Sequence, residues 1–168
     1  TLMAILCCAG CATPGPASGS VVTVTDDRGT AVHVPSPVER VVSLAPSETE
    51  ILGVLGRADL LAGRTDYCTW PPEVLRAPTV GGPRTFSVEA VVALDPDLIL
   101  ATHIVDRQRL DALRQMGYPV LEFGPDTVEE IYDNIRRMGI AIGEEENATR
   151  VVEGLRVKEQ AVRASNLG

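Results

Sequence analysis

The fold of this chain is decided by the stretch RVVSLAPSETEILGVLG, residues 40–56. It begins with an apolar run at 40–44, which is typical of a short buried strand, and a proline then ends that strand. The SETE motif at 47–50 has the spacing of a capping box, which marks the start of a helix. Glycines follow near the end of the stretch, so we expect a strand followed at once by a short helix that ends at 53–56.

The same alternation of strand and helix continues along the chain. Further apolar runs typical of buried strands lie at 60–64, 97–102 and 119–123. Helix signals follow these runs or separate them, at 87–94, 106–116 and 127–143. The alternation predicts an α/β fold, a Rossmann-like open parallel sheet flanked by helices.

Two further elements frame the predicted sheet. In VVTVTDDRGTAVHVP, residues 21–35, valines alternate with polar residues around a turn signal, and this pattern predicts an N-terminal β-hairpin. From Asn147 to the end of the chain, apolar residues recur at helical spacing. We therefore expect the chain to end in one long helix.

Composition excludes several classes of function. Hydrophobic residues make up 45% of the 168 residues and charged residues 23%, which is typical of one globular domain. The formal net charge of −8 disfavours nucleic acid and anionic membrane surfaces as partners, because both would repel the chain. The two histidines, His33 and His103, are far apart, and no group of Cys and His has metal-ligand spacing, so no protein-held metal is expected.

The first residues predict export from the cytoplasm. LMAILCCAG, residues 2–10, is an apolar run too short to span a membrane, and its length suits a secretory signal. Cys11 follows small residues and precedes a flexible linker, which is similar to a lipoprotein signal whose Cys becomes acylated. We expect an incomplete signal peptide at 1–10, a lipoprotein tether at 11–20 and an extracytoplasmic protein that contacts the membrane only through a lipid on Cys11. A plain signal peptide and a buried apolar strand are the alternatives.

Three segments together resemble one known family. They are RVVSLAPSETEILGVLG at 40–56, GRTDYCTWPPE at 63–73 and VGGPRTFSVEAVVALDPDLILA at 80–101. They resemble the helical-backbone (class III) periplasmic solute-binding proteins of ABC importers, which bind cobalamin, haem and ferric siderophores. The segment TDYCTWPPE is most similar to the cobalamin-binding members.

The resemblance implies an architecture of two α/β lobes that face each other across a cleft and are joined by one long helix. Residues 21–143 would form the N-terminal lobe, 144–168 would begin the connecting helix, and the second lobe would be absent from this sequence. Ligand would bind on loops at the carboxyl ends of the strands, which is the general rule for open parallel sheets.

The predicted ligand contacts lie on loops at that edge of the sheet. Tyr67 follows a predicted strand, and its ring can cover a flat macrocycle with little loss of conformational entropy, although it can also pack on its own loop. Trp70 either contacts the ligand as well or stacks on the two prolines that follow it. Free backbone N–H groups at the helix start can bind an anionic or amide group. The predicted ligand-binding residues are Pro46, Ser47, Tyr67, Trp70, Gly82, Pro83 and His103.

Glu89 is the expected docking residue. In the family, a Glu in the first turn of this helix docks to arginines of the membrane permease, and Glu89 has that register after the helix-capping Ser87. The alternative is that Glu89 only complements the helix dipole.

The resemblance predicts capture of cobalamin or a related corrinoid and its delivery to an ABC permease, with the metal chelate as ligand and no cofactor of the protein's own. A ferric siderophore or haem is the alternative ligand within the family. A solitary lobe that only docks to other proteins, or an α/β enzyme, is less favoured. Nothing places a nucleophile or a histidine beside Asp66 and Glu73, and Gly53 to Gly56 lack a dinucleotide-binding fingerprint, so we predict that the chain is not an enzyme.

Overall fold

A computed structural model describes residues 19–165. Cys11, the signal peptide predicted at 1–10 and most of the predicted tether lie outside the described residues, so their roles stay predictions. Within the described part, no helix combines the length and the apolar character needed to cross a bilayer.

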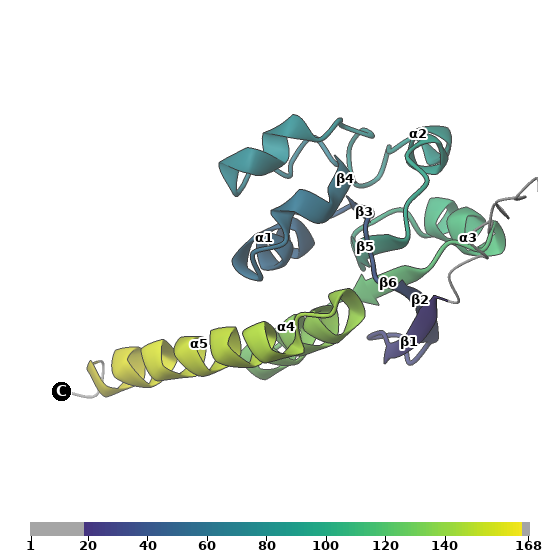
Figure 1. The fold of residues 1–168 in the computed structure, drawn as a ribbon. Coiled ribbons are helices and arrows are strands. Elements are labelled where there is room, and N and C mark those ends of the chain that lie inside the picture. The colour runs from purple at the N-terminus through teal and green to yellow at the C-terminus, as the bar shows by residue number, and fades with distance from the viewer. Residues whose placement is uncertain (1–18, 166–168) are drawn as a thin grey trace, which may run out of the picture.

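A four-stranded parallel sheet forms the centre of the fold, in the order β4-β3-β5-β6 (Figure 1). The middle strand β3 pairs with β4 on one side and with β5 on the other, and β6 forms the far edge. The strands span Val41–Ser43 (β3), Leu61–Arg64 (β4), Leu98–Thr102 (β5) and Val120–Phe123 (β6). The predicted α/β fold with an open parallel sheet is therefore confirmed.

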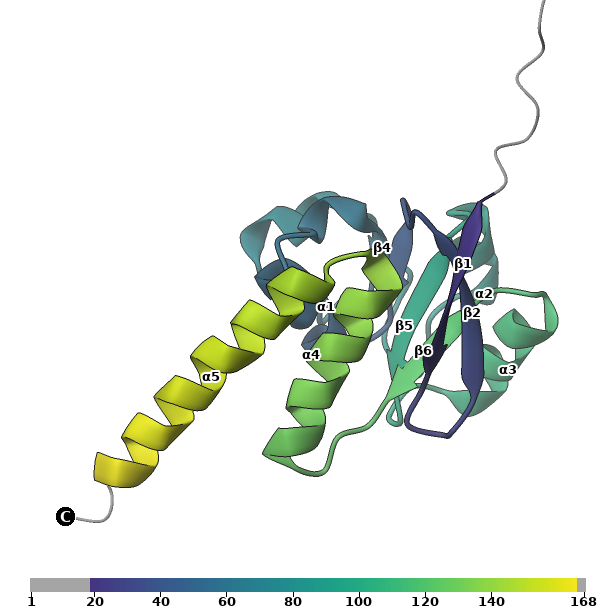
Figure 2. The same ribbon diagram turned by 60° about the horizontal axis from the view of Figure 1, so that its bottom comes forward.

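Helices cover both faces of this sheet (Figures 1 and 2). One face carries α1 (Pro46–Val54) and α4 (Val128–Ile142), and α5 (Glu145–Ser165) packs along α4. The other face carries α2 (Val88–Ala93) and α3 (Arg107–Gln115). Two short 3₁₀ helices flank β4, at Ala58–Leu60 (η1) and Pro72–Arg76 (η2). The hairpin of β1 (Ser20–Thr25) and β2 (Ala31–Ser36) packs against α4, so the predicted N-terminal hairpin and long final helix are confirmed.

The alternation of side chains along β5 divides the interior into two cores. Leu98 and Leu100 belong to the core beneath α1 and α4, whereas Ile99 and Ala101 belong to the core beneath α2 and α3. All four side chains are fully buried, as expected for a parallel strand that has helices on both faces.

Helix caps show where the sequence pattern was right and where it was wrong. The capping box at Thr127 and Glu130 is confirmed, and Ser87 accepts a hydrogen bond from the Ala90 N–H at 3.0 Å. The capping box predicted at Ser47 is wrong, because α1 already begins at Pro46. Proline is preorganised for the first helical position, so the Ser47 hydroxyl lies inside the first turn and donates to the Glu48 carboxyl group instead.

Two other boundaries differ from the prediction. The double proline at 71–72 predicts a loop without regular structure, because proline lacks the N–H that helices and strands use, yet Pro72 is the first residue of η2, a position that needs no N–H group. The final helix begins at Glu145, two residues before Asn147. Gly143, in the left-handed conformation with φ 75°, ends α4 and lets the chain reverse into α5.

Gly139 and Gly154 give a test of the packing between α4 and α5. A Cβ at Gly139 would lie 2.5 Å from the Ala148 Cβ, whereas a Cβ at Gly154 would meet nothing within 4 Å. Both substitutions to alanine gain roughly 0.5–1 kcal/mol of helix propensity, but overpacking at Gly139 costs about 1–3 kcal/mol. In urea unfolding, we expect Gly139→Ala to lower the free energy of unfolding and Gly154→Ala to raise it. A higher free energy of unfolding in both variants would contradict the close packing of α4 and α5 at Gly139.

Candidate functional site

The loops that follow the strands enclose a hollow at the carboxyl edge of the sheet. Its volume is about 460 Å³. Three of the predicted ligand-binding residues line it, namely Tyr67, Gly82 and Pro83. The other lining residues are Asp66, Arg84, Thr85 and Ile104. The structure thus brings together residues from the loops after β4 and β5 and from the loop before α2.

A tight turn at residues 65–68 presents Tyr67 to this hollow. The Cys68 N–H donates to the Thr65 carbonyl at 3.1 Å, and the side chains of these two corner residues are fully buried. Between them, Asp66 and Tyr67 point outwards, and 67% of Tyr67 is exposed. The Asp66 N–H also donates to the Gly81 carbonyl at 3.1 Å, which ties the turn to the neighbouring loop. A rigid turn therefore holds a largely free aromatic ring at the rim of the hollow.

The glycines of the neighbouring loop allow this close approach. A Cβ at Gly82 would lie 3.1 Å from the Thr85 Oγ1 and 3.7 Å from the Tyr67 Cε2, so the tyrosine ring lies over the glycine backbone. Gly81 has a φ of 106°, a conformation that side chains rarely adopt. The backbone conformation therefore requires glycine at position 81, and the glycine at 82 leaves room for the Thr85 hydroxyl and the Tyr67 ring.

Arg84 is the most informative lining residue that the sequence analysis missed. Its side chain is exposed, and no carboxylate in residues 19–165 forms an ion pair with it. Ile104, which is 46% exposed, adds an apolar surface. Each directly follows a predicted site residue in the sequence, and that adjacency was the available signal. The hollow therefore combines an aromatic ring, an apolar surface and a cation.

The remaining predicted residues do not line this hollow. Trp70 is half exposed and lies against α1, because a Cβ at Gly53 would be 3.7 Å from the Trp70 ring. His103 lines a separate hollow of about 340 Å³ and packs on the backbone of Gly124. Pro46 is half-buried and Ser47 is exposed at the start of α1, outside both hollows. Within residues 19–165, no three His, Cys, Asp or Glu side chains are grouped to hold a metal ion.

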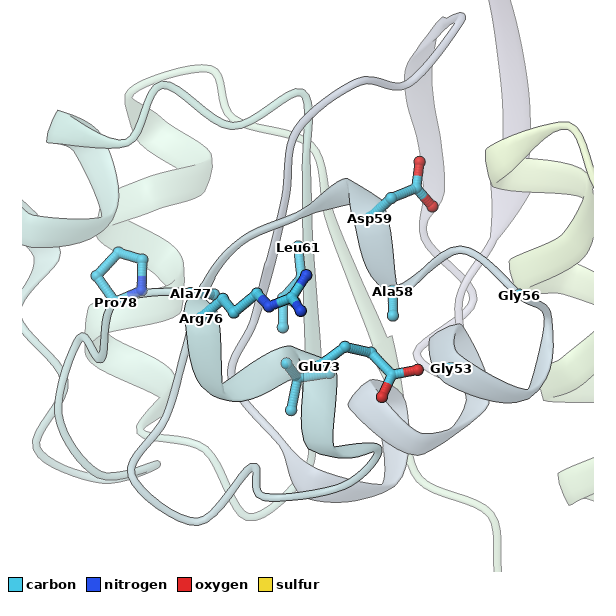
Figure 3. A pocket seen from close by; sticks show the side chains of 10 residues that line it. Gly53, Gly56, Ala58, Asp59, Leu61, Glu73, Arg76, Ala77 and Pro78 are labelled. Carbon is cyan, nitrogen blue, oxygen red and sulfur yellow. The ribbon is translucent and has the colours of Figure 1, made fainter.

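A larger hollow, of about 550 Å³, lies at the opposite end of β4 (Figure 3). The Glu73 and Arg76 side chains of η2 extend into it, and it contains none of the predicted ligand-binding residues. Size alone would favour this hollow. We nevertheless take the Tyr67 hollow as the candidate site, because ligands of open parallel sheets bind outside the carboxyl ends of the strands.

A buried carboxyl group lies in the first turn of α1, next to Ser47. Burial raises the pKa of Glu48 to about 8, although the Ser47 hydroxyl and the Arg137 guanidinium act in the opposite direction. The charge of Asp27 raises the pKa further, and the Glu48 Oε2 has no hydrogen-bond partner among residues 19–165. Glu48 is therefore protonated at neutral pH in the folded chain.

The raised pKa predicts a loss of stability with rising pH. Between pH 4.5, the ordinary value, and pH 8, the folded chain keeps a proton on Glu48 that the unfolded chain has released, so the free energy of unfolding falls across this window. Glu48→Gln removes this contribution. We expect its stability relative to the wild type to increase by at least about 1 kcal/mol from pH 5 to pH 8, since one pKa unit corresponds to about 1.4 kcal/mol. Glu50→Gln, a substitution at an exposed position of the same helix, is the control. If the free energy of unfolding changed with pH in the same way in the wild type and in Glu48→Gln, the raised pKa of Glu48 would be refuted.

Comparison of this chain with known proteins identifies its family. Residues 41–166 match the family described as periplasmic binding protein. The uncharacterized ABC transporter substrate-binding lipoprotein YvrC of Bacillus subtilis is 32% identical, over 92% of this chain and 53% of its own length. The chain spans 53% of the length of this relative, and 38% and 28% of the length of two other curated relatives.

Solved structures of similar proteins have the same fold. The periplasmic vitamin B12-binding protein BtuF of Vibrio cholerae is 32% identical, with a TM-score of 0.70 over 77% of this chain and 51% of that protein. A periplasmic haem-binding protein from Pseudomonas aeruginosa is 26% identical, with a TM-score of 0.69 over 74% of this chain and 46% of that protein. Since the family match covers most of the sequence, the chain belongs to the periplasmic binding protein family.

Proposed function

We propose that this chain is the N-terminal lobe of the extracytoplasmic substrate-binding component of an ABC importer, and that it captures cobalamin or a related corrinoid. The observation that carries the proposal is the turn that holds Tyr67, largely exposed, over Gly82 at the carboxyl edge of the sheet. A free ring on a rigid turn suits a large, flat, partly apolar ligand, because little side-chain entropy is lost on binding. The role is capture and release, with no bond made or broken.

Arg84 adds a requirement for the ligand. Arg84 lines the same hollow as Tyr67 and Ile104. A ligand that offers an apolar face to the ring and an anionic group to the guanidinium satisfies both sides. Cobalamin carries a phosphate in its nucleotide loop and fits this description. Pro83 belongs to the same surface, while Pro46, Ser47, Trp70 and His103 are proposed as contacts at its margin.

Haem is the second candidate ligand, and the similarity to the haem-binding protein of Pseudomonas aeruginosa favours it. Haem offers a flat apolar face with two propionates, so the Tyr67 hollow alone does not separate it from cobalamin. A ferric siderophore remains the third choice within the family. Titration of the chain with cyanocobalamin, haemin and ferrichrome distinguishes them, and the proposal requires the tightest binding with cyanocobalamin.

An extracytoplasmic location accords with the family and with the lipoprotein relative from Bacillus subtilis. We propose that the chain is held at the membrane by a lipid on Cys11, which lies outside the described residues. Gly19 then leads directly into β1, which begins at Ser20.

Removal of the Tyr67 ring tests the proposed ligand site. We expect Tyr67→Ala to weaken binding of cyanocobalamin about 5- to 150-fold by calorimetric titration, which corresponds to the roughly 1–3 kcal/mol lost with a buried aromatic contact. Tyr118→Ala removes the same ring from a half-buried position next to the start of β6, at the other end of the sheet, and should leave the affinity unchanged. Equal affinities of the wild type and Tyr67→Ala would exclude Tyr67 from the site.

Glu89 is proposed to dock the lobe to arginines of the permease. It lies in the first turn of α2, fully open to solvent, and accepts a hydrogen bond from the Ser87 hydroxyl at 2.8 Å. Its own backbone N–H and the Ser87 hydroxyl hold the pKa of this carboxyl below its ordinary value. The carboxylate therefore stays charged in mildly acidic surroundings.

Reversal of this charge tests the docking role. We expect Glu89→Arg to abolish uptake of labelled cyanocobalamin by cells that express the importer, while the affinity for the ligand stays the same, because repulsion replaces attraction at the permease. Glu153→Arg, the same reversal at an exposed position of α5, should transport normally. Normal transport by Glu89→Arg would refute docking through this residue.

A further inference from the structure

Arg64, the last residue of β4, is a nearly buried cation beneath the Tyr67 turn. Its guanidinium donates to the carbonyls of Thr65 at 3.2 Å, Cys68 at 3.1 Å and Ala77 at 3.2 Å. No carboxylate among residues 19–165 forms an ion pair with it. The charge is therefore compensated by backbone oxygens alone.

This arrangement ties the shape of the turn to the burial of the charge. A buried cation is costly unless hydrogen bonds compensate it, and hydrogen bonds from a charged donor are stronger than neutral ones. Two of the three acceptors are the corner residues of the turn, Thr65 and Cys68. If the turn moved, the guanidinium would lose its acceptors, so the turn has one favoured position.

The backbone of the same residue holds the second loop of the site. The Arg64 N–H donates to the Pro78 carbonyl at 3.1 Å, and the Arg64 carbonyl accepts from the Val80 N–H at 2.8 Å. Val80 leads directly into the Gly81–Gly82 segment, over which the Tyr67 ring lies. One residue thus fixes the turn through its side chain and the glycine loop through its backbone.

We propose that Arg64 is the positioning residue of the ligand site, which holds Tyr67 against the glycine loop without contacting the ligand itself. Its effect on affinity rests on the proposed function, whereas its effect on the turn does not. The side chain of Cys68 provides an independent measure of the turn, since it is a free thiol, fully buried, 3.1 Å from the Thr65 hydroxyl.

The first experiment measures the rate at which iodoacetamide alkylates Cys68 in the full chain, resolved by mass spectrometry of the Cys68 peptide. We expect Arg64→Met to accelerate the reaction at least tenfold and Arg64→Lys to fall between it and the wild type, because lysine keeps the charge but loses the planar set of donors. Met138→Ala, which removes packing from the core beneath α1 and α4 rather than from the core that contains Val80, is the control for global stability and should react at the wild-type rate. An unchanged rate in Arg64→Met would overturn the proposal, as would an equal acceleration in the control.

The second experiment is a double-mutant cycle with cyanocobalamin as the probe. We expect Arg64→Met to weaken binding at least fivefold in the wild type but less than twofold in the Tyr67→Ala background, since Arg64 acts through the tyrosine. Equal losses in both backgrounds would refute positioning through Tyr67. If the wild-type chain bound no cyanocobalamin, the proposed corrinoid function would fail while the alkylation result still decided the role of Arg64.

Discussion

Parallel pairing throughout the sheet, with β3 between β4 and β5 and with β6 beside β5, determines the rest of the structure. It brings the carboxyl ends of all strands to one edge, so every loop that can carry a ligand contact lies there. It also buries the strands on both faces, which requires helices on each side and accounts for the two cores. The site follows from this geometry and from the particular loops that leave β4 and β5.

Buried polar groups lie beneath and beside those loops, and each is compensated or uncharged. Arg64 compensates its charge with backbone carbonyls, and the turn above it presents Tyr67. Buried Glu48 at the start of α1 is tolerated in its protonated form. On the far strand, the Glu122 carboxylate is paired with Arg28 at 3.2 Å and Arg114 at 2.9 Å, and the pairing with Glu122 raises the pKa of Arg28. The edge that carries the candidate site is therefore built from buried polar contacts as well as apolar packing.

Local patterns in the sequence were sufficient for the sheet, the hairpin and two of the caps. Ser87 and Thr127 cap helices through partners that lie three residues away, and a local sequence pattern reveals this spacing. The cap at Ser47 failed because the preceding Pro46 competes for the first helical position, and spacing alone does not rank the two signals.

The order of elements predicts which loops meet at the site, but it does not predict the contacts of individual side chains. Tyr67, Gly82 and Pro83 share one hollow because their loops leave the same edge, which the order of elements predicts. The orientation of the Trp70 side chain depends instead on its contact with Gly53 in α1, and no local sequence pattern encodes that contact. The same holds for Arg64, whose acceptors include a carbonyl 13 residues away.

The central claim is that a corrinoid binds at the Tyr67 edge of the lobe. The most direct measurement is the change in the ¹⁵N–¹H NMR spectrum of the chain on addition of cyanocobalamin. We expect the backbone signals of 65–68 and 81–85 to shift, while those of 53–59 and 73–78, around the larger hollow at the other end of β4, stay in place. Shifts confined to this second group, or no shift at all at millimolar cyanocobalamin, would contradict it.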